Sequence, residues 1–469
     1  MRESIAWAAV ATVVGGCSFV PAYHRPAAPV AAVFVGAGGG GGLEAADRGW
    51  RDVFPDPRLQ RLIALALANN RDLSVAVLDI ELAAAEHQLQ RSALLPTIGA
   101  VATPSIQGTR NSASAQYQVG VGVTAFEVDL FGRVRALTAA ALQDYFATAE
   151  TRRSVHLALV ASVAEQYASE RALAEQHALA VQTLAAVMAS QVVIEQRFEA
   201  GRTSELDAAT AMTQVAAAQA EVARLARLEA QATNALVLLI GQPLPTDLPA
   251  PTAIAQQTVV ADLPAGLSST LLERRPDILS AEHSLEAANA DIGAARAALF
   301  PTISLTAFAG LTSTALANLF TAGAFGWSVG NALQPTVTLP LFDGGHNHAR
   351  LAAARVRLKI RVAQYQKAIQ VAFREVSDGL VARDRYVEQR TAQEARVAAE
   401  QQRYSLSQAR YTGGLENYLV VLTAQQDLYA AQQQLIDVEL ARMTSSIDLY
   451  KALGGGWLEH TQVAASSRP

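Results

Sequence analysis

The chain has 469 residues and a formal net charge of -5, with 51% hydrophobic residues, 17% charged residues and one cysteine. The mild acidic excess without a basic block excludes a nucleic-acid-binding surface, and the single Cys17 excludes an internal disulfide or a cysteine-based metal cluster. The mean hydropathy of +0.17 is high for a soluble protein, but no apolar run after residue 20 reaches the ~18 residues of a membrane-spanning helix, so strands or attached lipid are the expected membrane contacts.

Residues 1–16 have the pattern of a secretory signal peptide. Arg2 precedes an apolar run from Ile5 to Val14, and two glycines lead to Cys17. This arrangement resembles a bacterial lipoprotein signal, which implies that Cys17 begins the mature protein and carries a covalent diacylglycerol and an N-acyl chain. Several acyl chains, at about 0.8 kcal/mol for each buried methylene, would form a firm anchor. The alternative is an ordinary secretory signal with an incidental buried cysteine.

Residues 17–55 are expected to form a lipidated N-terminal tether. From Pro21 to Gly42 this segment is rich in proline, alanine and glycine and has no repeating apolar pattern. Such a composition predicts a flexible linker.

The remainder of the chain is an internal duplication. Landmarks of the first half recur in the same order in the second half, at an offset of roughly 205 to 213 residues. The matched segments are Leu95-Pro96-Thr97-Ile98 with Phe300-Pro301-Thr302-Ile303, Leu130-Phe131-Gly132 with Leu341-Phe342-Asp343-Gly344-Gly345, Arg197-Phe198-Glu199-Ala200-Gly201 with Arg410-Tyr411-Thr412-Gly413-Gly414, and Ile240-Gly241 with Leu453-Gly454. The predicted domains are a first repeat at 56–250, a linker at 251–267, a second repeat at 268–455 and a C-terminal tail at 456–469.

Each repeat is predicted to contain a helix, two strands, a very long helix, a turn and a helix. Pro96 and Pro301 are expected to end the first helix of each repeat, because proline donates no hydrogen bond and clashes with the preceding turn. The strands are predicted from alternation, which is clear in residues 117–124, 302–312 and 328–341. Segments of about ten residues match the length that a tilted strand needs to cross a bilayer.

The long helices are predicted to start at Gly132 and at Gly344-Gly345 and to run without a proline to Gly201 and to Gly413-Gly414. Roughly 65 residues at ~1.5 Å each give helices roughly 100 Å long. In the second repeat, apolar residues from Leu351 to Leu380 are separated by sevens, fours and threes, which is typical of a coiled-coil seam. A length of this kind favours a rod or a tube.

Four strands cannot close a barrel, and an open strand edge in lipid leaves backbone groups unpaired. The sequence therefore predicts an oligomer. Three chains would supply twelve strands and a tube of helices continuous with them.

Several motifs resemble the outer membrane factor family, the TolC-like group, in its lipoprotein branch of NodT-type efflux proteins. They are Trp50-Arg51-Asp52-Val53-Phe54, Asn69-Asn70-Arg71-Asp72-Leu73, Asp129-Leu130-Phe131-Gly132, Arg274-Arg275-Pro276-Asp277-Ile278, Leu341-Phe342-Asp343-Gly344-Gly345 and Leu449-Tyr450-Lys451-Ala452-Leu453-Gly454-Gly455-Gly456-Trp457. The resemblance implies a mainly α fold with membrane β: a homotrimeric β-barrel of twelve strands, four from each chain, continuous with a long periplasmic α-helical barrel. It also implies an outer-membrane duct that works with a periplasmic adaptor and an inner-membrane RND-type pump to export drugs or other small molecules.

The same resemblance implies a periplasmic gate at the helix-turn tips, Gly201, Gly413 and Gly414. Leu419 falls where the family has a gate leucine, but Thr423 stands where it often has an aspartate and Gln426 where it often has an arginine. We expect Asp207, Glu205 and Glu416 to replace that charge. The alternative is that these acids only start helices, with Thr203 or Ser204 as the cap.

Other functions are less well supported by the sequence. A type I secretion duct would share the architecture, although that branch usually lacks a lipid anchor, and a periplasmic coiled-coil adaptor would lack paired membrane-length strands. Arg275-Pro276-Asp277 is typical of a helix start, and His346 and His348 would point to different faces of a helix, so no metal site is expected. No nucleophile motif, phosphate loop or dinucleotide fingerprint occurs, so neither an enzyme nor a cofactor is predicted.

Overall fold

The computed structural model describes residues 18–32, 34, 48–109, 112–259, 274–321, 325–326 and 333–461. The predicted signal peptide, Cys17 and residues 260–267 of the predicted linker lie outside them. The helices and strands are, in chain order, α2 (Trp50–Val53), α3 (Pro57–Asn69), α4 (Arg71–Ser92), β1 (Ile98–Thr109), β2 (Ser112–Val128), α5 (Arg133–Glu199), α6 (Glu205–Ile240), η2 (Ile254–Gln256), α7 (Pro276–Ala297), β3 (Thr302–Ser313), η4 (Leu316–Asn318), β4 (Phe325–Gly326), β5 (Leu333–Thr338), α8 (His346–Thr412) and α9 (Tyr418–Ala452).

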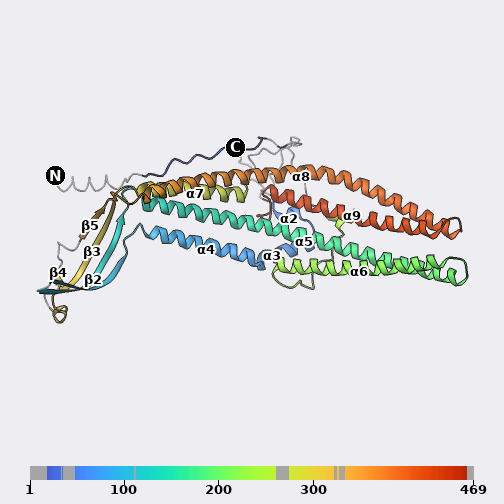
Figure 1. Cartoon of the computed structure of the whole chain (residues 1–469), viewed down its shortest axis with the longest axis horizontal. Helices are drawn as coiled ribbons and strands as arrows, with labels where there is room; N and C mark the ends of the chain where they lie inside the picture. Colours follow the sequence, from blue (N-terminus) through green and yellow to red (C-terminus); the bar gives the residue numbers. More distant parts are fainter. Residues whose placement is uncertain are drawn as a thin grey trace, which may run out of the picture. The chain divides into compact units, whose positions relative to one another are not determined.

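The chain forms two compact units, and each unit combines parts of both sequence repeats. Unit 1 contains Met1–Ala28, Leu78–Glu150 and Leu279–Ala368, and unit 2 contains Pro29–Val77, Thr151–Ile278 and Ile369–Pro469. Unit 1 therefore holds the strands, and unit 2 holds α6, α9 and the ends of α5 and α8 (Figure 1).

The sheet of unit 1 is antiparallel, with β2 between β1 and β3 and with β4 and β5 both on the other edge of β3 (Figure 1). Among the described residues, β1 pairs only with β2, and β5 pairs only with β3. The outer edges of β1 and β5 are thus open in the part of the chain that the structure describes.

One face of this sheet is apolar across all four long strands. Ile98 of β1 stands opposite Val123 of β2, which stands opposite Ala307 of β3, and Val128 of β2 stands opposite Ile303 of β3, which stands opposite Val337 of β5. Residues directly opposite each other share a face. The next rows on the same face are Ala100, Val121 and Ala309, then Ala102, Val119 and Leu311.

The other face of the sheet carries mainly glycines and polar side chains, with Val101 and Phe308 as apolar exceptions. Its rows include Gly99, Gly122 and Phe308, then Thr103, Gln118 and Thr312, and the β3–β5 pairs Ser304 with Thr336 and Thr306 with Gln334. Many of the apolar side chains on the first face are exposed, with Ile98 at 68% and Val337 at 64%. A wide exposed apolar face opposite a polar face is typical of a sheet that separates lipid from water.

The apolar face continues past a one-residue bulge in β2 that the sequence did not predict. Between the pairs Val123 with Ala307 and Phe126 with Leu305, β2 advances three residues while β3 advances two. Ala125 takes up the difference in a left-handed conformation with φ 51°. The apolar positions of β2 are therefore odd-numbered up to Val123 and even-numbered from Phe126.

The predicted helix boundaries near the prolines and glycines are close to those observed. α4 ends at Ser92 and α7 at Ala297, each four residues before its proline, and a short turn separates each helix from the following strand. The residue before a proline disfavours helical geometry, so the helix ends earlier than the proline itself. α5 and α8 each have 67 residues and begin one residue after the predicted glycines.

The core of unit 2 joins α3 to α5, α6 and α9. Trp50 and Phe54 pack in it with Tyr167 of α5 and Tyr450 of α9, and Tyr167 donates a hydrogen bond of 3.1 Å to Asp56, which also caps α3. Arg275 is buried, and its guanidinium binds Asp277, Glu375 and the Ala452 carbonyl. The predicted helix-start motif therefore also ties the start of α7 to the end of α9.

Among the described residues, α5 is the one helix long and apolar enough to cross a membrane by length and composition. The expectation from the sequence concerned uninterrupted apolar runs, which this criterion of length and composition does not require. A different part of α5 contributes to the protein core, because Val163 and Ala164 are fully buried in unit 2.

Candidate functional site

The first hairpin tip connects α5 to α6. Gly201 has φ 68°, a left-handed conformation that glycine adopts without strain. The Arg202 amide donates to the Arg197 carbonyl at 2.7 Å, and the Gly201 amide donates to Phe198 at 2.9 Å. These bonds form a Schellman-type helix end, which satisfies carbonyls that the helix leaves unpaired.

The second tip connects α8 to α9 through the same type of helix end. Gly414 has φ 74°, and the Leu415 amide donates to the Arg410 carbonyl at 2.9 Å. Gly413 lies just before it and donates to Ala409. Gly414 and Gly201 are 213 residues apart, so the predicted duplication extends to the hydrogen bonds of the tips.

Asp207 forms a capping box at the start of α6. Its carboxylate accepts hydrogen bonds from the Thr203 hydroxyl at 2.7 Å and the Ser204 hydroxyl at 2.9 Å, while the Ser204 hydroxyl accepts from the Asp207 amide. These hydrogen bonds lower the pKa of Asp207. The helix-start role considered from the sequence is thus present in the structure, with Ser204 as the cap. A gate role for Asp207 stays a prediction.

The other two candidate acids differ in their surroundings. Glu205 is exposed at the start of α6. Glu416, in the second tip, is paired with Arg410 at 3.3 Å. The three acids therefore do not form one cluster of equivalent carboxylates within a single chain.

Leu419 and Thr423 lie on one exposed face at the start of α9. Leu419 is 62% exposed, and the Thr423 hydroxyl donates to its carbonyl at 2.9 Å. The opposite face of α9 is buried through Tyr418, Val421 and Leu422, which pack against Ile194 of α5 and Ala211 of α6. The predicted gate residues Leu419 and Thr423 are thus directed away from the contacts between the hairpins.

The sequence did not predict the side chains that join the two hairpins near their tips. The Arg197 guanidinium lies over the Tyr411 ring, and Tyr411 and Tyr418 are in ring contact at 5.7 Å. Burial and the nearby charges, including that of Asp207, raise the pKa of Tyr418. Arg197 and Tyr411 both belong to the segments that match between the two repeats, and this match was the sequence signal from which the contact could have been predicted.

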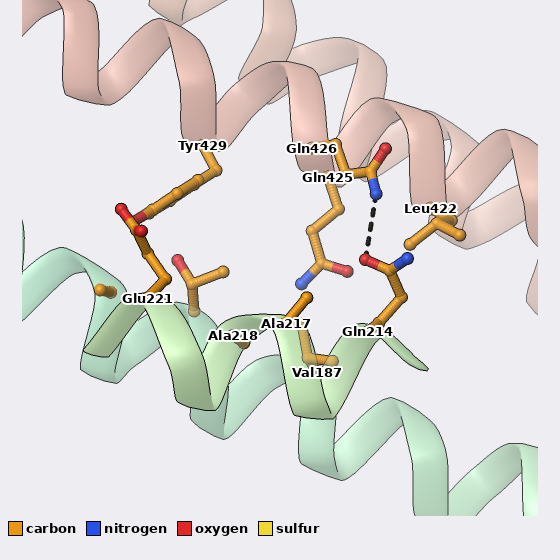
Figure 2. Close-up of a pocket in the computed structure, with 11 residues that line it drawn as sticks. Val187, Gln214, Ala217, Ala218, Glu221, Leu422, Gln425, Gln426 and Tyr429 are labelled. Atoms are coloured by element: carbon orange, nitrogen blue, oxygen red, sulfur yellow. Dashed lines mark hydrogen bonds between the residues drawn. The ribbon is translucent and has the colours of Figure 1, made fainter. Parts of the chain in front are cut away.

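A cavity of about 160 Å³ lies between the two hairpins, farther from the tips (Figure 2). Gln426 of α9 donates to Gln214 of α6 across it at 3.0 Å. At the other end of the cavity, the Arg224 guanidinium donates two hydrogen bonds of 2.7 Å to the Glu221 carboxylate. These hydrogen bonds lower the pKa of Glu221. Because Arg224 already pairs with this carboxylate, we interpret the cavity as a packing gap between helices and not as a site that binds a cation.

The model of a family described as outer membrane efflux protein matches residues 62–242 and 267–455. The chain belongs to the outer membrane efflux protein family. Among curated relatives, the toluene efflux pump outer membrane protein TtgC of Pseudomonas putida is 43% identical over 476 residues, covering 99% of this chain and 97% of that protein. The outer membrane protein OprJ of Pseudomonas aeruginosa is 41% identical over 461 residues, covering 96% and 95%.

Solved structures of outer membrane efflux channels have the same fold. The open state of the MtrE outer membrane channel of Neisseria gonorrhoeae has a TM-score of 0.86 and 39% identity, covering 95% of this chain and all of that chain. A membrane protein from Pseudomonas aeruginosa gives a TM-score of 0.86 and 39% identity, covering 96% and 100%. The expectation of an outer-membrane efflux channel, and not an enzyme, is therefore confirmed.

Proposed function

We propose that three copies of this chain close a twelve-stranded barrel and form a passive duct for small molecules in a tripartite efflux pump. The duct would work with a periplasmic adaptor and an inner-membrane RND-type pump. Relatives named for toluene, solvent and antibiotic efflux support drugs and small apolar organic compounds as the cargo. Acyl chains on Cys17 would anchor the duct to the membrane.

The single observation that carries this proposal is the open sheet with one apolar face. β1 and β5 each have one edge without a partner among the described residues, and the exposed side chains Ile98 and Val337 suit a lipid environment. In lipid, each unpaired backbone group costs several kcal/mol. Pairing β5 of one copy with β1 of the next removes both edges, and three copies of four strands give a closed barrel.

The internal duplication predicts the register of that new pair. Ile98 pairs with Val123 and Ile303 pairs with Val337, so Val337 of β5 corresponds to Val123 of β2. Val123 pairs with Ala307, which corresponds to Ala102 at the repeat offset of 205 residues (307 − 205 = 102). Val337 is therefore expected to lie opposite Ala102 of the adjacent copy.

Disulfide cross-linking in outer membranes tests the closure. The double variant Val337→Cys with Ala102→Cys, in a Cys17→Ala background, is expected to give covalent trimers on oxidation. Thr336→Cys with Ala102→Cys is the matched control, because Thr336 belongs to the opposite face of the sheet and is expected to give none. A native mass equal to one chain would refute the trimer, and equal cross-linking in both variants would refute the predicted register.

The lipid anchor has a separate test in the otherwise unchanged chain. Intact-protein mass spectrometry is expected to show acyl groups on the wild type and to lack them in Cys17→Ala. Equal masses, apart from the substitution itself, would reject lipidation and leave the channel proposal standing.

A further inference from the structure

The cavity between α5, α6 and α9 lies within unit 2, and each helix contributes one stripe of side chains to its wall (Figure 2). The lining residues of α6 run from Gln214 to Glu221 and those of α9 from Leu422 to Tyr429, both at spacings of three, four and seven residues. Positions with this spacing lie on one face of a helix. The cavity is therefore formed where three helix faces meet within a single chain.

Small side chains leave this space open. Ala180, Ala217 and Ala218 each contribute only a methyl group, and Val187 and Leu422 form further apolar walls. Protein interiors are otherwise packed as densely as organic crystals, so a space of about 160 Å³ leaves wall atoms without contacts that a bound molecule could supply. An apolar protein cavity of about 150 Å³ binds benzene. The volume thus suits a molecule with one aromatic ring.

Most polar groups around the cavity already have partners. The Gln426 amide donates to Gln214 at 3.0 Å, and the Tyr429 hydroxyl donates to Glu221 at 3.5 Å. Glu221 is the one charged group among the described lining residues, and Arg224 neutralises it. A charged ligand would find no free opposite charge here, so the structure favours a neutral one.

Gln425 is the exception. Its side chain extends from α9 toward Ala217 of α6 across the cavity (Figure 2), and the residue is only 8% exposed. The Gln425 amide makes no hydrogen bond within the part of the chain that the structure describes. A buried amide without a partner is costly, because it has given up its hydrogen bonds to water. Since an amide both donates and accepts, a hydroxyl group is a suitable partner.

We propose that this cavity binds one neutral molecule of the phenol class, with its ring between the alanines and Leu422 and its hydroxyl on the Gln425 amide. Pockets for small molecules combine apolar walls with a few polar groups that fix the orientation of the ligand. The walls come from both repeats, so a bound molecule contacts both hairpins. The site lies within one chain and does not depend on the proposed trimer, cargo or lipid anchor.

Ligand titrations of the full-length protein in detergent test this site. The probes are para-fluorophenol and fluorobenzene, and fluorine NMR separates saturable binding from partition into the micelles. The wild type is expected to bind one para-fluorophenol per chain. Ala218→Leu, whose larger side chain fills the cavity, is expected to lose saturable binding of both probes. Helix content and the unfolding midpoint show whether this variant is folded.

A second variant tests the hydrogen bond. Gln425→Leu has a similar size but no amide, so the ratio of para-fluorophenol affinity to fluorobenzene affinity is expected to fall roughly tenfold, because the buried hydroxyl loses its partner. Gln432→Leu is the matched control, since Gln432 lies farther along α9 and does not line the cavity. It is expected to leave the ratio unchanged.

Three results would overturn the proposal. They are the absence of saturable para-fluorophenol binding to the wild type, equal saturable binding to folded Ala218→Leu, and an unchanged affinity ratio in Gln425→Leu. If Ala218→Leu does not fold, the ratio in Gln425→Leu still decides. None of these results bears on the efflux duct, because the probes report a site inside one chain.

Discussion

The Arg197 guanidinium, in the last turn of α5, lies 4.6 Å from the centre of the Tyr411 ring near the end of α8. This cation–π contact joins the two hairpins of one chain just before their tips. It is also a contact between repeat landmarks, because Arg197 matches Arg410 and Tyr411 follows that residue directly.

Removing the cation is expected to loosen the tips. An exposed cation–π contact contributes about 0.5–1 kcal/mol, so Arg197→Gln should shift an opening equilibrium that separates the hairpins by roughly two- to fivefold. Open probability in planar bilayers measures the shift. Arg197→Lys keeps the cation and should behave like the wild type; the same open probability in Arg197→Gln would show that this contact does not restrain the tips.

Asp207→Asn is expected to weaken the start of α6 by about 1 kcal/mol at neutral pH, as does the loss of a helix cap. The folded-state pKa of Asp207 is lowered from 3.8, so its contribution is present above that value and is lost as the pH falls through the folded pKa. Unfolding midpoints of the variant and the wild type should therefore differ at pH 7 and converge in strong acid. A difference that is constant with pH would contradict this reasoning.

The same variant also tests the gate. If Asp207 of each copy approaches the axis of the proposed trimer, Asp207→Asn should change open probability or cation preference in planar bilayers. An unchanged conductance would leave Asp207 with its capping role alone.

Glu165 predicts a second and opposite pH dependence. Burial, and then the Asp448 charge, raise the pKa of Glu165 to about 7 from its ordinary 4.5. A raised carboxyl pKa means that the stability present below pH 4.5 is lost as the pH rises through 7. Glu165→Gln should flatten the fall in heat stability between pH 5 and pH 8, and Asp448→Asn should flatten it partly. A fall as steep in Glu165→Gln as in the wild type would exclude this assignment.

Gly120 is expected to be essential for the sheet, because a Cβ atom there would collide with the Ala309 carbonyl oxygen of β3. Gly120→Val should prevent β2 from pairing with β3 and should abolish heat-resistant oligomers in outer membranes. Gly99→Val is the control, since a Cβ atom at Gly99 meets nothing within 4 Å in the chain. Normal assembly of Gly120→Val would disprove the close approach of the two strands.

The sequence was most informative where the signal was local. The glycines before α5 and α8 and those at the two tips predicted the helix ends to within a few residues, because a positive φ is an intrinsic demand on the residue that adopts it. The alternation of β2 predicted its apolar face as far as Val123. The bulge at Ala125 was missed, because only the partner strand β3 defines it.

The sequence also did not predict contacts between segments that are far apart along the chain. Nothing near Arg25 in sequence indicates that it binds Glu282, which is 257 residues away. The flexible linker predicted from the composition is therefore not observed in this part of the chain. Leu419 and Thr423 were placed by resemblance, and their exposure within one chain agrees with a surface that other copies could complete. Which side chains line the axis depends on those copies.

The one-residue bulge of β2 determines which side chains lie on the apolar face and which lie on the polar face near the junction of β2 and α5. With it, Phe126 and Val128 continue the apolar face, and Glu127 stands opposite Ser304 and binds Arg133 through both of its oxygens. A regular strand that kept all its residues would turn Phe126 and Val128 to the polar face and Glu127 to the apolar face, whereas deleting Ala125 would remove the bulge and leave all three on their present faces. The alternation of apolar and polar residues in β2 changes phase at Ala125, and the bulge cancels that change, so the wall of the channel keeps a single apolar side.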